Sequence, residues 1–327
     1  MKKFYSFCII ILLTGVHVYG EEDQDRMIPD IQVSGYVQGV YASIHNDVQI
    51  NTDTFKVNRA RLGVHIEISS AITGFVSTEL TGSELADAFI SYVPYAWIGL
   101  RCGQMKIPLT YEARQSEPEL DFIEYSRPVQ ELVISSPGLR DAGAQILSNG
   151  SFWDAVCMIS NGSGANTEDQ DEHKAFSGRA SVCKDHMSIG GSLYRTKRLH
   201  VTGVEENIVR YAGEIQIGDE TGFLRSEYIL GKEGKIKKDG LVITGDTGMP
   251  FVSPMAYHMI PLRFMIRFEQ WDPNTKIDDD AESLVVFGLR YPVNRLVRVD
   301  INYTIVQEET EAQIKNNRFA VQGQLRF

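Results

Sequence analysis

Arginine and acidic residues recur at alternate positions in several short segments, and these side chains are the ones best suited to chemistry. Arg59 and Arg61 stand two residues apart, as do Arg225 and Glu227. In an extended strand, alternate residues lie on one face. A guanidinium stays charged and binds oxyanions through a planar fork of donors, so such a face could guide small anions. The other interpretation is that the arginines pair with the acids and keep the wall rigid.

Both interpretations place these side chains on a water-facing wall. The candidates for lining an aqueous pore are Arg59, Arg61, His65, Glu67, Arg101, Arg210, Glu214, Arg225, Glu227, Arg263, Arg267, Glu269, Arg298 and Asp300. Among them, His65 is expected to be a wall residue rather than a catalytic base.

A second group of charges lies in the proline-containing stretch 106–138, which shows no strand pattern. The candidates for a constriction in this loop are Glu112, Arg114, Glu117, Glu119, Asp121, Glu124 and Arg127. A structureless stretch of this length inside a compact protein is usually functional. We therefore expect it to fold inward and narrow a pore, with an extracellular lid as the alternative.

The sequence offers little support for catalysis or for nucleic-acid binding. No G-x-S-x-G, H-E-x-x-H or G-x-x-x-x-G-K-[ST] stretch occurs, the histidines are scattered, and Cys102, Cys157 and Cys183 have no metal-ligand spacing. We therefore expect no catalytic residue, cofactor or metal. An enzyme with a spatial dyad, such as an outer-membrane phospholipase, is a remaining alternative. The net charge of −11 argues against a nucleic-acid partner.

The polar residues must be positioned by strands, because sixteen segments of about ten residues show period-two patterning. Their spans are 31–43, 55–68, 71–82, 84–93, 96–105, 139–148, 151–160, 174–184, 186–195, 206–217, 220–230, 250–258, 261–271, 282–291, 295–306 and 317–327. In the last of them, Phe319, Val321, Leu325 and Phe327 alternate with polar residues up to the final position. Such an ending needs a partner strand to hold it.

The gaps between these segments favour a transmembrane antiparallel up-and-down β-barrel of about 16 strands over a soluble secreted β-sandwich. Tight gaps follow the even-numbered strands, whereas long gaps such as 106–138, 161–173 and 231–249 mostly follow the odd-numbered ones. Short turns on one rim and long loops on the other are typical of membrane barrels. The stretch 106–138 would then be a long third outer loop, and both termini would lie at the periplasmic rim.

The first twenty residues have the composition of an export signal. Lys2 and Lys3 precede an apolar stretch, Cys8 to Leu13, and small residues follow near Gly20. The apolar stretch is far shorter than the roughly 20 residues of a membrane-spanning helix. We expect residues 1–20 to be a signal peptide and residues 21–327 to form one barrel domain in the outer membrane.

Several blocks resemble the phosphate-selective porin O and P family. The segment Phe55 to Val64 (FKVNRARLGV) is similar to a second-strand pattern of that family, and the blocks ADAFISY (86–92) and GLRCGQMKIP (99–108) are similar to its next blocks. The short stretch LRYPVN (289–294) and the final strand also fit. The resemblance implies a sixteen-stranded outer-membrane porin, commonly a homotrimer, which the assembly machinery would recognise by its C-terminal strand.

Together these observations predict a water-filled channel for passive diffusion of small hydrophilic solutes and ions. The wall arginines would face the loop acids across the constriction and set a transverse field. The alternative is an anion or phosphate-selective channel, in which the loop acids turn outward. The acidic outer loops, which would repel phosphate, favour the first interpretation. Expected partners are outer-membrane lipid and lipopolysaccharide.

Overall fold

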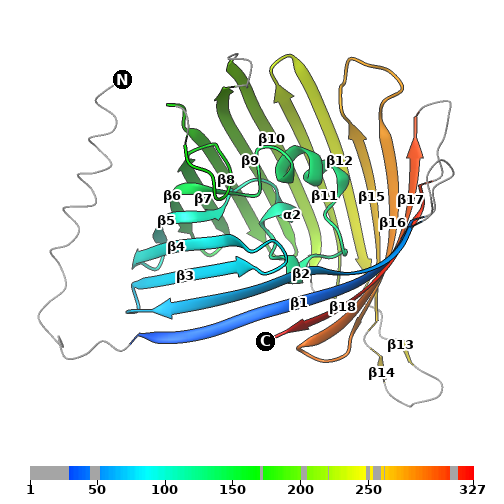
Figure 1. The fold of residues 1–327 in the computed structure, drawn as a ribbon, viewed down its shortest axis with the longest axis horizontal. Helices are drawn as coiled ribbons and strands as arrows, with labels where there is room; N and C mark the ends of the chain where they lie inside the picture. Colours follow the sequence, from blue (N-terminus) through cyan, green and yellow to red (C-terminus); the bar gives the residue numbers. More distant parts are fainter. Residues whose placement is uncertain are drawn as a thin grey trace, which may run out of the picture.

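The computed structural model of the chain describes residues 29–44, 52–169, 172–199, 205–219, 221–247, 251–252, 259–260, 262–309 and 316–327. Sixteen strands form one closed antiparallel barrel, in which each strand pairs with its neighbours in chain order and β1 pairs with β18 (Figure 1). The barrel strands are β1 (Asp30–Ile44), β2 (Thr52–Glu67), β3 (Ile72–Glu79), β4 (Glu84–Tyr95), β5 (Ile98–Lys106), β6 (Arg140–Asn149), β7 (Trp153–Ser160), β8 (Ala175–Lys184), β9 (Met187–Leu199), β10 (Glu205–Asp219), β11 (Gly222–Glu233), β12 (Ile236–Thr247), β15 (Arg263–Asp272), β16 (Glu282–Pro292), β17 (Val297–Glu308) and β18 (Arg318–Arg326).

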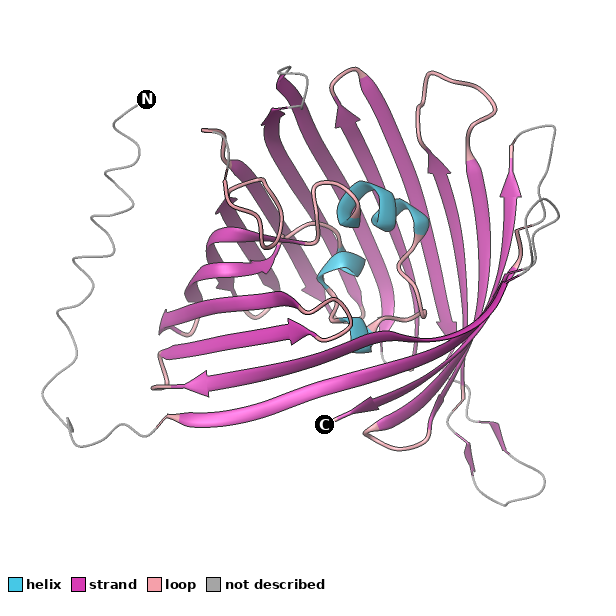
Figure 2. Ribbon diagram, viewed as in Figure 1, coloured by secondary structure: helices cyan, strands magenta, loops and turns pink. Residues whose placement is uncertain are grey.

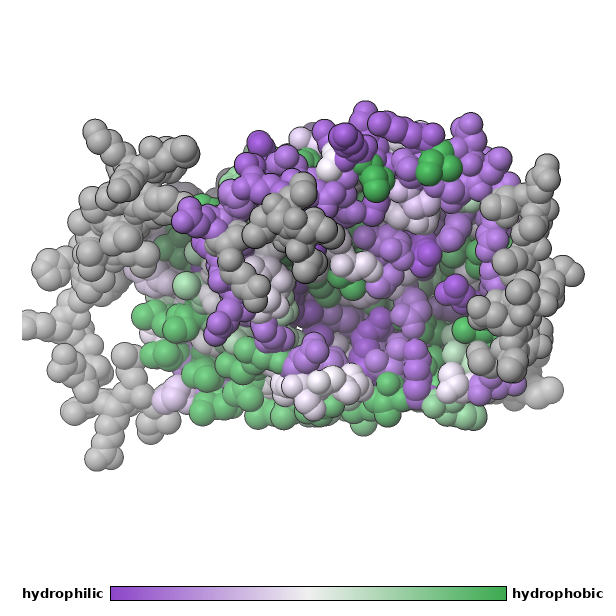
Figure 3. Space-filling view, turned by 45° about the horizontal axis from the view of Figure 1, so that its top comes forward, coloured by the Kyte–Doolittle hydropathy of each residue, from purple (hydrophilic) through white to green (hydrophobic). Residues whose placement is uncertain are grey.

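The alternation in β15 illustrates why these segments become barrel strands. Phe264 and Ile266 are about half exposed on the outside, whereas Met265, Arg267 and Glu269 between and beyond them are buried on the inside. An apolar outer face suits lipid, and a polar inner face suits a water-filled or protein-filled lumen. Hydrophobic side chains accordingly gather on the outer surface of the barrel, and hydrophilic ones gather at its mouth and in its lumen (Figure 3).

The last residue closes the barrel. The backbone N–H of Phe327 donates to the carbonyl of Gly35 in β1 at 3.0 Å, and the N–H of Gly35 donates to the carbonyl of Phe327 at 2.9 Å. A Cβ atom at position 35 would lie 2.7 Å from the Phe327 ring, so only glycine lets the ring lie over β1. The terminal strand is therefore held by a partner strand, as its alternation predicts.

The predicted twelfth strand, 250–258, is wrong. The barrel strand is β12, which lies within the segment 231–249 that was expected to be an outer loop. Phe251–Val252 forms β13, which pairs with β14 (Met259–Ile260) in a separate two-stranded sheet, and residues 253–258 lie outside the described residues. The lysines between Lys232 and Lys238 gave this segment the composition of a solvent-exposed loop. In the structure they lie at the ends of two strands, near the rim of the barrel.

This correction also changes the arrangement of the loops. The connection between β11 and β12 is a tight turn at Gly234 and Lys235 on the rim of the long loops, so β12 ends and β15 begins at the rim of the termini. The other short turns and long loops alternate as expected, so the long-loop rim is the extracellular one. The predicted signal peptide, residues 1–20, lies outside the described residues.

The connection between β5 and β6, residues 107–139, lies inside the barrel, as Figures 1 and 2 show. It contains the short helices α2 (Tyr111–Arg114), η2 (Glu117–Glu119), α3 (Arg127–Val129) and η3 (Gln130–Ile134). We call residues 107–139 the inner loop. In the described parts of the chain, no helix combines the length and the apolar character needed to cross a membrane.

One side of the inner loop forms a small hydrophobic core against the wall. Leu109, Leu132 and Val133 are fully buried there and belong to one cluster with Tyr194 of β9 and Ile229 of β11. Burial of each such side chain contributes about 1.5–3 kcal/mol. The inner loop is therefore a packed part of the barrel.

Candidate functional site

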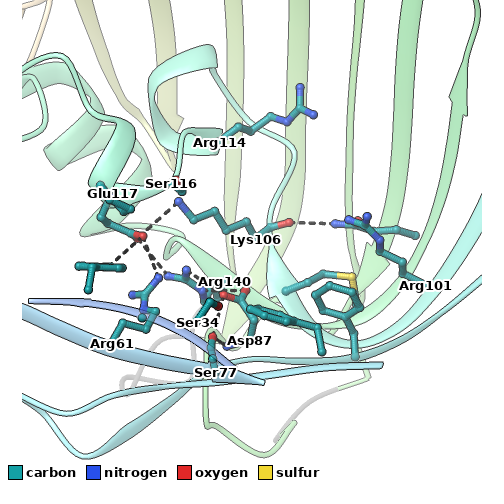
Figure 4. A pocket seen from close by; sticks show the side chains of 18 of the residues that line it. Ser34, Arg61, Ser77, Asp87, Arg101, Lys106, Arg114, Ser116, Glu117 and Arg140 are labelled. Atoms are coloured by element: carbon teal, nitrogen blue, oxygen red, sulfur yellow. Dashed lines mark hydrogen bonds and ion pairs between the residues drawn. The ribbon is translucent and has the colours of Figure 1, made fainter. Parts of the chain in front are cut away.

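Glu117 of η2 lies at the centre of a charged cluster between the inner loop and the wall. Its carboxylate is 2.7 Å from the Arg61 guanidinium of β2, 3.4 Å from Nζ of Lys106 in β5 and 3.6 Å from the Arg140 guanidinium of β6 (Figure 4). The side chain is only 4% exposed. The alternation of β2 turns Arg61 inward, whereas Lys106 and Arg140 lie where β5 ends and β6 begins, next to the inner loop. Three strands therefore converge on one acid. We call these four residues the Glu117 cluster.

The charges of this cluster stabilise the ionised form of Glu117. Burial alone would raise the pKa of the carboxyl, because a low-dielectric environment disfavours a charge. The neighbouring charges of Lys106, Arg140 and Arg61 outweigh burial and lower the pKa from 4.5 to about 2. Glu117 is therefore an anion at neutral pH, and it neutralises part of the positive charge of the wall.

A cavity of about 510 Å³ lies beside the Glu117 cluster, between the inner loop and the wall formed by β1 to β7. We call it the inner cavity. It extends toward the rim of the termini, where Ser34, Gly35 and Phe327 line it. Its charged lining consists of six cations and two acids, which are Arg61, Arg101, Lys106, Arg114, Arg140, Arg326, Asp87 and Glu117.

Both acids of the inner cavity have close cationic partners. Glu117 is held by its cluster, and Asp87 of β4 accepts two hydrogen bonds from the Arg140 guanidinium at 3.0 and 3.1 Å. Arg101 of β5 forms no ion pair with any described residue, and its guanidinium lies 5.0 Å from the centre of the Phe89 ring. The closest carboxylate to Arg114 of α2 is that of Asp154, at 3.8 Å. The charged groups that line the inner cavity are therefore mainly cationic, and acids outside this lining pair with Arg61, Arg114 and Arg326.

A smaller cavity of about 310 Å³ shares Arg61 and Arg140 with the inner cavity. Its other lining residues include Glu79, Glu84 and Asn166, which lie toward the extracellular rim. Because two side chains of the Glu117 cluster line both cavities, a solute that crosses between these cavities must pass these guanidinium groups. The cluster is thus the candidate constriction.

The remaining wall arginines fasten the inner loop to the other side of the barrel. Arg290 and Arg298 donate to the carbonyl of Leu120, and Arg210 donates to the carbonyls of Leu132 and Ser136 at 2.8 and 3.2 Å. These arginines bind neutral carbonyl oxygens of the loop, which positions the loop without using its acids.

The acids of the inner loop are also paired with the wall rather than separated from it by a gap. Asp121 lies 2.9 Å from Arg225, Glu112 lies 3.2 Å from Arg267, and Glu124 lies 3.5 Å from Arg59. Glu119 likewise pairs with Arg326 at 2.5 Å, whereas Glu131 pairs with Arg127 of the loop itself at 2.9 Å. The acids therefore face the arginines, as the sequence predicts, but they contact them.

Three acids of the wall interact with backbone N–H groups of the inner loop or with an arginine of the wall. Glu227 of β11 accepts the N–H groups of Tyr111 and Glu112 at 3.0 and 3.1 Å, so it caps α2 from across the lumen. Glu269 accepts a hydrogen bond from the N–H of Arg127, and Glu214 pairs with Arg179. Each interaction fixes either the loop or the wall beside it.

The other wall candidates lie away from the Glu117 cluster. His65 and Glu67 lie at the end of β2 near the rim of the termini, where they pair in register with Phe75 and Thr73 of β3. Arg263 pairs with Asp246 of β12, and Arg298 pairs with Asp300 at 2.8 Å.

Sequence reasoning missed Arg140 and Asp246 and left Lys106 out of the candidate pore wall. Arg140 was overlooked because strict alternation from Gln145 would place it on the outer face of β6, whereas at the first position of the strand it reaches the lumen. Asp246 lies in β12, which was interpreted as a loop. Lys106 could have been found from its position, because it is the last residue of β5 and directly precedes the inner loop.

The fold and the polar lumen define the class of this protein, which is an outer-membrane porin. Solved porin structures have the same architecture at low identity. OmpT of Vibrio cholerae superposes with a TM-score of 0.67 at 11% identity, covering 94% of this chain and 100% of that chain. Salmonella typhi OmpF gives 0.64 at 13% identity, covering 91% and 97%, and Pseudomonas putida OprB gives 0.63 at 9%, covering 91% and 94%.

The family is established by sequence. The family model described as phosphate-selective porin O and P matches residues 31–232, and the chain belongs to that family. Among curated proteins, no match to the chain is found. The expected barrel class, the outer-membrane location and the channel function are thereby confirmed.

Proposed function

We propose that this channel favours small anions over cations and that phosphate-like oxyanions are among its solutes. The observation that carries the proposal is the lining of the inner cavity, where six cations accompany two acids. A narrow passage lined by one sign of charge, between walls of low dielectric, concentrates ions of the opposite sign. The family description, which names phosphate selectivity, agrees with this proposal.

The pairing of the loop acids supports anion preference over the transverse-field interpretation. A transverse field needs acids and arginines that face each other across open water. Here Glu117 lies 2.7 Å from Arg61, and Asp121 lies 2.9 Å from Arg225, so these charges largely cancel. Arg101 forms no ion pair with a described residue, and the acid nearest to Arg114, Asp154, also pairs with Arg179 at 2.9 Å. We assign Arg101 and Arg114 to attracting anions.

General diffusion without preference is the second candidate, and the acidic extracellular rim favours it. Asp278, Asp279 and Asp280 lie in the connection between β15 and β16, and Glu308 and Glu309 lie at the end of β17. These acids would repel anions from the mouth. Their effect falls off within roughly 8 Å at physiological salt, whereas the inner-cavity charges act at contact with the solute.

We further propose the assembly that the sequence suggests. The chain would be exported by residues 1–20 and would function as a barrel of residues 21–327 without catalysis or a cofactor. Its C-terminal strand would engage the assembly machinery. A homotrimer is supported by the trimer form of Vibrio cholerae OmpT, which superposes with a TM-score of 0.66 at 11% identity. Gel filtration with light scattering in detergent would measure the oligomeric state.

The selectivity proposal is tested by neutralising Arg101 and Arg114. We expect the double variant Arg101→Gln and Arg114→Gln to shift the reversal potential in a KCl gradient toward the cation side. The matched control is Lys184→Gln, because Lys184 lies on the outer face of β8 at the rim of the termini. An unchanged reversal potential in a correctly folded double variant would refute the proposal.

A further inference from the structure

The outer face of the barrel carries a row of basic residues near the extracellular rim. Arg195 of β9 pairs in register with Val209 of β10, Val209 pairs with Lys232 of β11, and Lys232 pairs with Lys237 of β12. The three basic residues therefore lie along one line across four adjacent strands. We call Arg195, Lys232 and Lys237 the basic row.

The neighbours of the basic row in the chain show that it faces outward. Tyr194 is fully buried in the core beneath the inner loop, and Arg210, beside Val209, binds the loop carbonyls. Lys238 pairs with Glu233 at 2.6 Å on the inner side. Because successive residues of a strand alternate between faces, Arg195, Lys232 and Lys237 point away from the lumen. All three are exposed.

The basic row has no counter-ion among the described residues, although other basic residues nearby do. Lys197, two residues further along β9, lies 3.2 Å from Glu205. Arg195, Lys232 and Lys237 form no ion pair within the described part of the chain. Lys232 and Lys237 are directly opposite each other, and like charges in that position are destabilising. An anion bound from outside would relieve this repulsion.

The row directly below, toward the membrane, is apolar over the same strands. Leu193 of β9, Tyr211 of β10 and Leu230 of β11 pair in register, and they are 37%, 57% and 43% exposed. Apolar side chains beneath a line of cations match the boundary between acyl chains and headgroups, where tyrosine settles. The acids Asp239 and Asp272 continue this lower row at β12 and β15 and limit the site on that side.

We propose that the basic row binds the phosphate groups of lipopolysaccharide in the outer leaflet. Adjacent strands are about 4.8 Å apart, so the long side chains of Lys232 and Lys237 can reach one phosphate while Arg195 reaches a second group on the same headgroup. Charge-assisted hydrogen bonds to phosphate are strong, and arginine makes them through its fork. The apolar row beneath provides the surface for the acyl chains. A two-fold pairing with a second copy of this chain is disfavoured, because it would bring two basic rows together.

The experiment uses the full mature chain, refolded in detergent without lipopolysaccharide, and purified diphosphoryl lipid A as the probe. Native mass spectrometry would count bound lipid, and a heat-modifiability gel would verify the closed barrel. We expect wild type to bind diphosphoryl lipid A and the variant Arg195→Ser, Lys232→Ser, Lys237→Ser to bind at least tenfold more weakly. Lys184→Ser, on the same outer surface at the opposite rim, should bind like wild type.

A second measurement on wild type alone keeps the test independent of variant folding. Dephosphorylated lipid A and phosphatidylglycerol should each bind at least tenfold more weakly than diphosphoryl lipid A, and added salt should weaken binding. Equal binding of dephosphorylated lipid A would overturn the assignment to phosphate, and equal binding of phosphatidylglycerol would overturn the assignment to lipopolysaccharide. Wild-type binding by the folded triple variant would overturn the assignment to the basic row. None of these outcomes bears on ion selectivity, which depends on the lumen.

Discussion

Replacing Glu117 with glutamine removes one charge and nearly preserves the shape of the side chain. The Arg61 guanidinium would retain Glu79 at 3.4 Å, and Arg140 would retain Asp87 at 3.0 Å. Lys106 would retain only backbone carbonyls, those of Ala113 and Gln115. Breaking a buried ion pair costs about 3–5 kcal/mol. Because two of the three cations keep another carboxylate, we expect about 3 kcal/mol, the lower end of that range.

Two assays would follow this change. Urea unfolding in lipid vesicles, monitored by the fluorescence of the three tryptophans, measures the loss of free energy of unfolding. The reversal potential in a KCl gradient measures selectivity. Since Glu117 is a shared partner of Arg61, Lys106 and Arg140, its loss adds one positive charge to the lining of the inner cavity. We therefore expect stronger anion preference together with lower stability.

The effect of Glu117→Gln should also depend on pH in a defined direction. The folded pKa of Glu117, about 2, is below its ordinary value of 4.5. A lowered carboxyl pKa contributes stability that is fully present above the ordinary value and is lost as pH falls toward the folded value. The difference in stability between wild type and variant should therefore stay constant above about pH 5 and shrink between about pH 4.5 and 2.

Glu131→Gln is the matched control for this prediction. Glu131 lies in the same loop and pairs with Arg127 at 2.9 Å, but its side chain is 32% exposed. Pairs of this kind contribute about 0.3–0.5 kcal/mol. If Glu117→Gln changed stability and reversal potential no more than Glu131→Gln did, the assignment of Glu117 as the central charge of the constriction would be refuted.

Three further changes test the loop, the lipid face and the closure of the barrel. Leu132→Ala, at a fully buried position of the inner loop, should cost about 2–5 kcal/mol and raise single-channel conductance by loosening the loop; conductance equal to wild type would contradict this. Ile266→Arg should lower the free energy of unfolding by about 2–4 kcal/mol if it lies near the bilayer midplane, with Ile266→Val as control; an equal effect of both would show that position 266 does not face lipid. Deleting Phe327, which pairs with Gly35, should slow folding into vesicles measured by the heat-modifiable gel shift, and wild-type folding rates would disprove its role in closure.

The architecture was largely predictable because the period-two pattern reports directly which face of a strand meets lipid. The prediction from this pattern failed at β12, where Lys237 and Asp239 lie on the outer face near the rim. The pattern assumes an apolar outer face, and it cannot anticipate charges placed at headgroup height. Most other strands and the position of the inner loop followed from sequence alone, since the longest gap fell after the fifth strand.

The site was predictable only in part. Alternation places Arg61 inward, but it does not identify the residue that Arg61 contacts. The path of the inner loop determines that Glu117, rather than Glu119, reaches Arg61. Register also matters, because the bulge opposite Gln38 and Gly39 turns both Asn58 and Arg59 inward, where they bond to Gln322 and Gln38. Strict alternation allows only one of two consecutive residues to do so. These features arise from tertiary packing, which a single strand pattern does not contain.

The reversal potential of the wild-type channel in a planar bilayer, under a tenfold KCl gradient at neutral pH, tests the central claim most directly. The six cations that line the inner cavity, Arg101 and Arg114 among them, predict a reversal potential of the sign expected for chloride selectivity and a current that added phosphate reduces. A potential on the potassium side, unaffected by phosphate, would contradict the claim that the lumen selects anions.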